Sequence, residues 1–194
     1  KYNILHNTYS YLKHDPSNIN TLPSDNIWHM TTDSKGRLLI ATMSGGISFY
    51  DIENNIFTNY TNDPDNPQSL NDSYVYFIYE DKQQTIWAGT AGHGLNRFNP
   101  QSGSFTHYVP DLDDHGSISN KTIRTMYEDS KNRFWVGTEA GLNLMNRKKG
   151  TFKAYYRKDG LSDNAIRHIL EDKSGVLWIT TANGLCKFIP EKEK

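Results

Sequence analysis

Short apolar stretches alternate with clusters of Gly, Asn, Asp and Ser along the whole chain. The apolar stretches are rich in Val, Ile, Tyr, Phe and Trp, the residues that favour β-strands. None of them repeats its apolar positions with the 3.6-residue period of an amphipathic helix. The pattern therefore predicts an all-β fold of many short strands joined by tight turns.

This pattern occurs four times. The segments IWHMTTDSKGRLLIATMSGGISFY, VYFIYEDKQQTIWAGTAGHGLNRFN, IRTMYEDSKNRFWVGTEAGLNLMN and IRHILEDKSGVLWITTANGLCKFI align almost without gaps. A turn aspartate recurs at intervals of 43 to 48 residues, as Asp33, Asp81, Asp129 and Asp172. A second column holds tryptophan in three of the four units, as Leu39, Trp87, Trp135 and Trp178. A period of this length predicts a repeat architecture rather than a single irregular domain.

Each unit predicts four strands. One precedes the aspartate turn, one follows it, the third begins at a Gly-aliphatic pair, and the fourth is an F-x-x-Y stretch. Four-stranded units of this period are typical of β-propeller blades. The whole chain, 1–194, is expected to be one propeller fragment. Its blades cover approximately residues 22–60, 70–108, 118–156 and 161–190.

The two ends of the chain predict how the last blade is completed. Residues 9–12 match the outer strand expected at 57–60. We therefore expect residues 5–15 to add an outer strand to the blade at 161–190, in the same chain or in a partner chain. An open arc would leave an apolar face at each end. A closed four-bladed ring is one solution, and an eight-bladed homodimer is favoured because the wedge angle suits larger rings.

The last two units follow the pattern I-x-x-I-x-E-D-x-x-G-x-L-W-I-G-T-x-x-G-L, which resembles the two-component regulator propeller repeat. The resemblance covers essentially the whole chain as four copies. The first copy departs most, with Leu39 in place of Trp and MSGG for the usual turn. WD40 and kelch signatures are missing from the sequence.

In that family, such repeats form the periplasmic sensor region of hybrid two-component systems. Further blades, a Tyr-rich β-sandwich, a membrane helix, a histidine kinase and often a response regulator accompany them. Many of these systems are thought to sense glycan fragments. The resemblance thus implies a periplasmic sensor module of a phosphorelay that responds to carbohydrate.

Composition and charge limit the classes of partner that we expect the chain to bind. The net charge is −1 and the charges are interspersed, so no basic block predicts nucleic-acid binding. No apolar run approaches the roughly 20 residues needed to span a bilayer. The chain opens KYNILHNTYS, without a signal-peptide pattern or an initiator Met, so an excerpt or a processed product is expected. The single cysteine, Cys186, is interpreted as a small buried residue.

Several charged groups could suggest chemistry, but each has a simpler interpretation. Neighbouring carboxylates recur at one turn of three units, as Glu80-Asp81, Glu128-Asp129 and Glu171-Asp172. A catalytic pair would occur once, so these indicate turn capping. The acidic loop at 111–120 lacks the full set of calcium ligands and is interpreted as a solvated connection. No metal spacing or nucleophile motif is present, so no catalytic residue, metal or cofactor is expected.

Two columns of the first strand are the best candidates for a binding site, because this strand lines the channel of a propeller. One column contains His29 and His168, for which a packed core role is favoured. The column one residue earlier holds large amphipathic groups instead of aliphatic ones. The candidate ligand-binding residues are Trp28, Tyr76, Arg124, Arg167, His29 and His168. Aromatic faces stack on sugar rings and guanidinium groups bind hydroxyls or carboxylates. Alternatively, the same side chains plug the channel or pair with a neighbouring Glu.

The sequence favours a non-catalytic module that senses an oligosaccharide or acts as a rigid scaffold. One alternative is a propeller lyase acting on a lactone or uronate, since a related repeat occurs in antibiotic-inactivating lyases. It would need a histidine base and a metal on one face, and only His29 and His168 approach this requirement. The other alternative is a protein-interaction platform without a small ligand.

Overall fold

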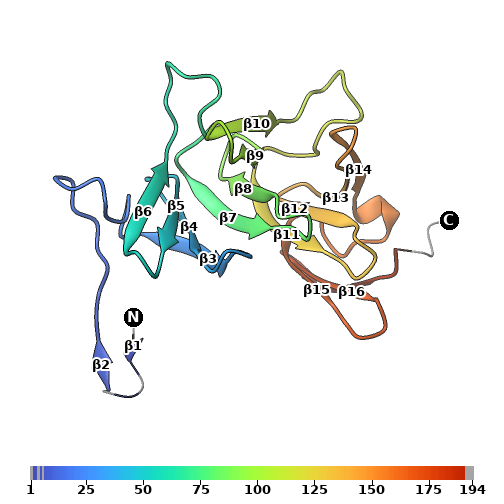
Figure 1. Ribbon diagram of the computed structural model, residues 1–194. Coiled ribbons are helices and arrows are strands. Elements are labelled where there is room, and N and C mark those ends of the chain that lie inside the picture. Colours follow the sequence, from blue (N-terminus) through green and yellow to red (C-terminus); the bar gives the residue numbers. More distant parts are fainter. Residues whose placement is uncertain (1, 4, 6, 191–194) are drawn as a thin grey trace.

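The computed structural model describes residues 2–3, 5 and 7–190. Over this part the chain forms antiparallel sheets that follow one another as the blades of an incomplete propeller (Figure 1). The predicted all-β fold and its four blade units are confirmed. In the described residues no helix is long and apolar enough to cross a membrane.

The blades follow the order of the chain. Blade 1 consists of β3 (Ile27–Thr32), β4 (Leu38–Thr42), β5 (Ile47–Asp51) and β6 (Ile56–Tyr60). Blade 2 consists of β7 (Val75–Glu80), β8 (Ile86–Thr90), β9 (Leu95–Asn99) and β10 (Ser104–Tyr108). Blade 3 consists of β11 (Ile123–Glu128), β12 (Phe134–Thr138), β13 (Gly141–Asn146) and β14 (Thr151–Tyr155). The 3-10 turn η1 (Arg157–Asp159) leads to blade 4, which consists of β15 (Ile166–Glu171), β16 (Leu177–Thr181) and β17 (Gly184–Phe188).

The repeated aspartate builds the turn between the first two strands of a blade. In blade 3, one carboxylate oxygen of Asp129 accepts the backbone N–H groups of Lys131 and Arg133. The other oxygen accepts the indole N–H of Trp135 at 2.9 Å. A single side chain thus satisfies turn donors and anchors the buried indole, which is the capping role expected from its recurrence.

Small residues let neighbouring blades approach closely. A Cβ added to Gly89 would lie 2.5 Å from a methyl carbon of Ile123, and one added to Gly137 would lie 2.6 Å from a methyl carbon of Ile166. Each glycine sits on the second strand of one blade, and each isoleucine begins the first strand of the next. Close packing at this point places the first strands side by side in the order β3, β7, β11 and β15.

The repeated glutamate fastens each blade to the one before it. Glu80 accepts the backbone N–H and the hydroxyl of Ser34, which lies in the turn of the preceding blade. Glu171 binds Ser130 in the same way, at 2.7 and 2.6 Å. The two residues of each Glu-Asp pair therefore have different roles. The aspartate caps the turn of its own blade, and the glutamate caps the turn of the preceding blade.

The expected completion of blade 4 within the chain is wrong. Its sheet has the order β15-β16-β17, and no described strand pairs with the outer edge of β17. Among the described residues of the segment 5–15, only Thr8–Tyr9 form a strand, β2, which pairs with β1 (Tyr2–Asn3) in a hairpin below blade 1 (Figure 1). The arc does not bring its ends together, so the N-terminal segment meets blade 1 instead. Completion by a partner chain remains a prediction.

Candidate functional site

A β-bulge in the first strand of every blade presents the candidate column. The ladder between the first and second strands skips one residue in each blade, at Trp28, Tyr76, Arg124 and Arg167. A bulged residue leaves the regular alternation of the strand, so its side chain is re-aimed. The sequence identifies the column by its unusual composition, and the bulge takes this one position out of the regular strand alternation in all four blades.

The bulged side chains form a continuous strip across the blades. The rings of Trp28 and Tyr76 lie 5.0 Å apart between centroids and are tilted by 41°. The Cζ atom of Arg124 lies 4.2 Å from the centroid of the Tyr76 ring. Arg124 and Arg167 both donate to the same oxygen, Oε1 of Glu139, through Nε and Nη1 respectively. We call Trp28, Tyr76, Arg124, Glu139 and Arg167 the mouth strip.

The mouth strip changes in character from one end to the other. Trp28 is 51% exposed and supplies an apolar face at the blade 1 end. The side chain of Arg167 is 43% exposed and supplies a charged group at the blade 4 end, whereas that of Arg124 is 25% exposed. Aromatic rings beside guanidinium groups form a surface suited to a ligand with both apolar faces and hydroxyl groups.

Glu139 is the one member of the strip that the sequence did not identify as a candidate residue. The sequence did offer, as one alternative, that the arginines pair with a neighbouring Glu. Burial raises the pKa of the Glu139 carboxyl group, but the hydrogen bonds from Arg167 and Arg124 outweigh burial and hold the pKa below its usual value. A signal was present in the sequence. The corresponding residues of the other units are uncharged, namely Met43, Ala91 and Ala182.

The two candidate histidines are placed differently from each other. The ring of His29 stacks on Phe77 of the next blade, with centroids 3.8 Å apart, and its Nδ1 lies 3.5 Å from the backbone N of Ile78. Burial lowers the pKa of His29, the contact with Ile78 raises it, and the charge of His168 lowers it further. His168 is exposed. His29 is packed against the next blade, whereas the exposed His168 does not have the packed core role that was favoured for both histidines. No group of three metal-binding side chains occurs in the described part of the chain.

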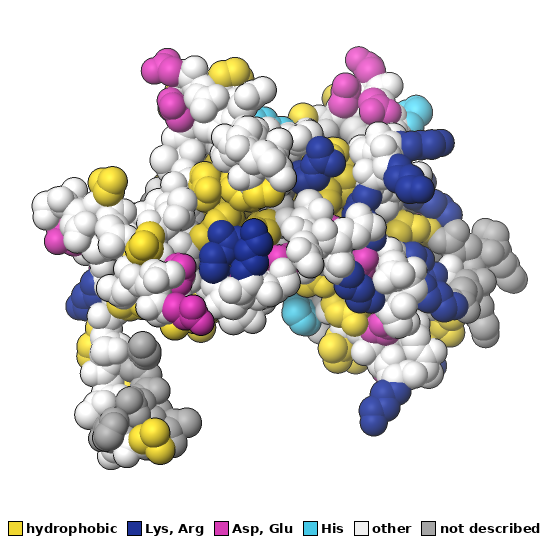
Figure 2. All heavy atoms as spheres, in the orientation of Figure 1, with side chains coloured by type: hydrophobic (Ala, Val, Ile, Leu, Met, Phe, Trp, Pro, Cys, Tyr) yellow, Lys and Arg dark blue, Asp and Glu magenta, His cyan; other side chains and the backbone are white. Residues whose placement is uncertain are grey.

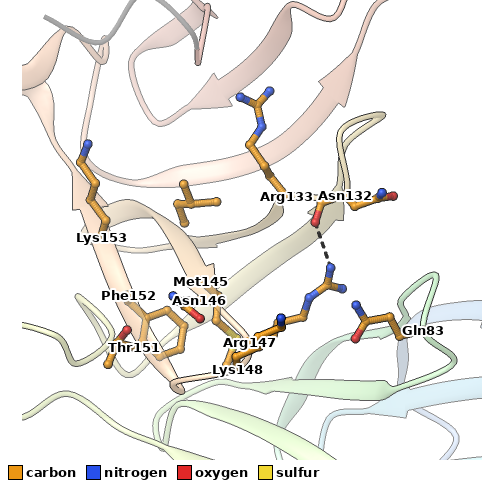
Figure 3. A pocket seen from close by; sticks show the side chains of 11 residues that line it. Gln83, Asn132, Arg133, Met145, Asn146, Arg147, Lys148, Thr151, Phe152 and Lys153 are labelled. Carbon is orange, nitrogen blue, oxygen red and sulfur yellow. Dashed lines mark hydrogen bonds between the residues drawn. The ribbon is translucent and has the colours of Figure 1, made fainter.

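A separate hollow of about 670 Å³ lies at the outer hairpin of blade 3 (Figure 3). Its arginines already serve the packing of the blades. Arg147 binds Asp81 of blade 2 at 2.9 Å and Glu128 of blade 3 at 2.7 Å. Arg133 binds Asp129 at 2.6 Å. The hollow includes none of the candidate residues, and its Arg147 connects blade 2 with blade 3.

Charged side chains are unevenly distributed over the surface. Acidic side chains lie at the tips of the two loops that project beyond the blades, one after β6 and one after β10 (Figure 2). In the loop after β10, Asp111 accepts the backbone N–H of Asp113, and Asp114 accepts that of Gly116. These carboxylates therefore stabilise local loop turns, which agrees with their interpretation as part of a solvated connection.

The family profile described as "two component regulator propeller" matches residues 69–92, 117–140 and 160–183. These segments are two-component regulator propeller repeats. They lie in blades 2 to 4, and each includes the aspartate turn and the strand that carries the tryptophan. Blade 1, where Leu39 replaces that tryptophan, lies outside the matched segments. No curated protein matches the chain at a significant level.

Several solved structures are similar in fold to the chain. One is an extracellular domain assigned to a hybrid two-component system of B. thetaiotaomicron, with a TM-score of 0.80 and 25% identity over 95% of this chain and 25% of that one. A second such domain from the same organism has a TM-score of 0.73 and 19% identity over 95% of this chain and 32% of that one. The chain therefore spans about a quarter to a third of these proteins.

An enzyme shares the fold. Inactive virginiamycin B lyase from Staphylococcus aureus has a TM-score of 0.62 and 20% identity over 88% of this chain and 58% of that one. At this identity the likeness concerns blade architecture alone, because one propeller framework supports unrelated functions.

Proposed function

We propose that the chain is a ligand-recognition module in the extracytoplasmic sensor region of a hybrid two-component signalling protein, and that its mouth strip binds a glycan fragment in the periplasm. The observation that supports this most is the four-fold bulge, which presents Trp28, Tyr76, Arg124 and Arg167 along one line. The extracellular location of the similar two-component domains supports the location.

The chemistry of the strip suits a sugar better than an extended apolar ligand. The exposed Trp28 offers a ring face to the C–H surface of a pyranose, and Tyr76 extends this aromatic surface, with centroids 5.0 Å apart. Arg124 and Arg167 keep N–H groups beyond those bound to Glu139, because a guanidinium group has five N–H donors. These donors can bind sugar hydroxyls. The strip is also open to solvent at both ends, so successive units of an oligosaccharide could occupy it.

Recognition fits the site better than catalysis. The ring of His29 is engaged with Phe77 and with the backbone of Ile78, so it is a poor candidate for a base that moves toward a substrate. Incubation of the purified chain with divalent metals and lactone or uronate substrates tests the lyase alternative directly. Turnover that depends on His29 or His168 would overturn the assignment to recognition.

Calorimetric titration of an oligosaccharide identified on a glycan array tests the proposal. Arg167→Ala should weaken binding by about 1 to 3 kcal/mol, the usual loss for a hydrogen bond from a charged donor. Arg157→Ala is the matched control, because it removes an exposed arginine from η1, outside the strip. Wild-type affinity in the double variant Arg124→Ala and Arg167→Ala would place the site elsewhere, and a blank array together with a co-purifying protein would favour an interaction platform.

A further inference from the structure

At the position of Glu139, the contact that recurs in other blades is a hydrogen bond of the backbone and involves no side chain. The backbone N–H of Glu139 donates to the carbonyl of Thr122, at 3.1 Å. Ala91 and Ala182 make the same backbone bond in blades 2 and 4, to Tyr74 and Ala165. The fold therefore needs no particular side chain at this position. A carboxylate in blade 3 alone must be explained by what the side chain contacts.

The carboxylate lies where the two guanidinium groups converge. Arg124 Nε and Arg167 Nη1 are each 2.5 Å from Oε1 of Glu139. A single oxygen thus takes the donors that would otherwise be available to the carboxylate or sulfate group of a ligand. All three side chains are partly exposed, so a ligand in the strip would reach this point.

We propose that Glu139 sets the charge selectivity of the mouth strip, admitting uncharged, hydroxyl-bearing ligands and excluding anionic ones. This inference rests on the proposed binding function of the strip and names the class of ligand that it takes. An anionic group would have to displace the Glu139 carboxylate or remain beside a like charge. A neutral sugar can use the remaining guanidinium N–H groups without disturbing Glu139.

The inference predicts that removal of the carboxylate creates an anion site. In Glu139→Ala, two guanidinium groups lose the negative charge they share, and an oxyanion can replace it with oxygens of its own. Alanine is the residue of blades 2 and 4 at this position, so the variant should fold. Glu139→Gln removes the charge but keeps an amide oxygen as acceptor, and its effect should therefore be smaller.

Sulfate is a suitable probe because it requires no knowledge of the natural ligand. Titration of the wild-type chain and both variants with sodium sulfate, at constant ionic strength, is followed through the Nε–H NMR signals of Arg124 and Arg167. We expect Glu139→Ala to bind sulfate about ten-fold more tightly than the wild type, equivalent to about 1.4 kcal/mol. The gain should disappear when Arg167→Ala is added.

Glu53→Ala controls for the change in net charge, since Glu53 is exposed in a turn of blade 1. Equal sulfate affinity of Glu139→Ala and the wild type, or an equal gain in Glu53→Ala, would overturn the inference. A wild-type strip that prefers glucuronic acid oligosaccharides to neutral ones would overturn it as well. Failure of all oligosaccharides to bind would contradict only the proposed function, because the sulfate result reports on Glu139 independently.

Discussion

Equivalent positions of the repeat are buried between blades and exposed at the two ends of the arc. Met30 of blade 1 is 60% exposed, whereas Met126 occupies the same column in blade 3 and is 2% exposed. At the other end, Leu185 of blade 4 is 61% exposed and its counterpart Leu142 is fully buried. The residue types are the same, so the presence of a neighbouring blade decides their burial. The repeat supplies surfaces for packing, and the arc leaves one such surface bare at each end.

The two end faces also differ in detail from the internal interfaces. The position of Gly89 and Gly137 is occupied by Thr180 on the open face of blade 4. The position of the capping glutamates is occupied by Thr32 on the open face of blade 1. Blade 4 therefore lacks the small residue that lets a following blade approach, and blade 1 lacks the carboxylate that would cap a preceding turn.

The largest effect is expected from the tryptophan column. Trp135 is fully buried in the cluster between blades 3 and 4, whereas Trp178 of blade 4 is only partly buried. Trp135→Ala should lower the free energy of unfolding by about 3 to 5 kcal/mol, as emptied core sites usually do. Trp178→Ala loses an equivalent bond to Asp172 but little packing, so it should cost clearly less. Equal losses in urea unfolding would show that inter-blade burial does not distinguish the two sites.

A smaller loss is expected where two blades approach most closely. Gly137→Ala would place a Cβ 2.6 Å from both Ile166 and Thr125, and overpacking of this kind costs about 1 to 3 kcal/mol. The interface between blades 1 and 2 has Ala41 and Val75 at the equivalent positions. Adding Ile166→Val to Gly137→Ala should therefore recover part of the loss. No recovery in the double variant would mean that Thr125, rather than the facing isoleucine, sets the limit.

The glutamate that joins two blades should contribute about 1 kcal/mol to the free energy of unfolding. Glu171→Gln weakens two hydrogen bonds from Ser130, in a partly exposed position where water can replace them. Thr32→Glu is the comparison on the open face of blade 1, which has no preceding turn to cap, and should change stability by less than about 0.5 kcal/mol. Thermal unfolding of both variants measures the difference. A stabilising Thr32→Glu would reveal a turn donor near that face, from the same chain or from another copy.

The smallest effect concerns association between copies. Head-to-tail pairing would close an eight-bladed ring from two chains, as the sequence favours, and we propose that it occurs only weakly. In such a dimer, Ile27 of one chain would face Thr180 of the other, at the position that Gly89 and Gly137 occupy in the internal interfaces. Thr32 would lie at the position of the capping glutamates. Light scattering should show a monomer that dimerises as concentration rises. Thr180→Gly should strengthen the dimer, and a tight wild-type dimer would show that the two end faces fit despite these differences.

The repeat was readable from the sequence because its determinants are local. The turn at Asp129, the strand that follows and the tryptophan bound to the same carboxylate all lie within a few residues of one another. The candidate column was also recognisable, since Arg124 and Arg167 stand where a core strand would repeat an aliphatic residue. Short-range hydrogen bonds and alternating burial define these features in every blade.

Only the tertiary structure decided how the blades combine. Glu139 meets Arg167 because the loop after β12 reaches the bulge of the following blade, 28 positions along the chain. The sequence of the N-terminal segment 5–15 resembles an outer strand, yet its described residues lie beside blade 1 (Figure 1). The chain that follows is connected to β6 by hydrogen bonds of Asn20 and Asn59. The local sequence pattern of an outer strand is the same whichever blade edge the strand pairs with, so the pattern does not identify that edge. The rotation between successive blades determines which edges and side chains meet, and that rotation depends on packing between residues distant in sequence.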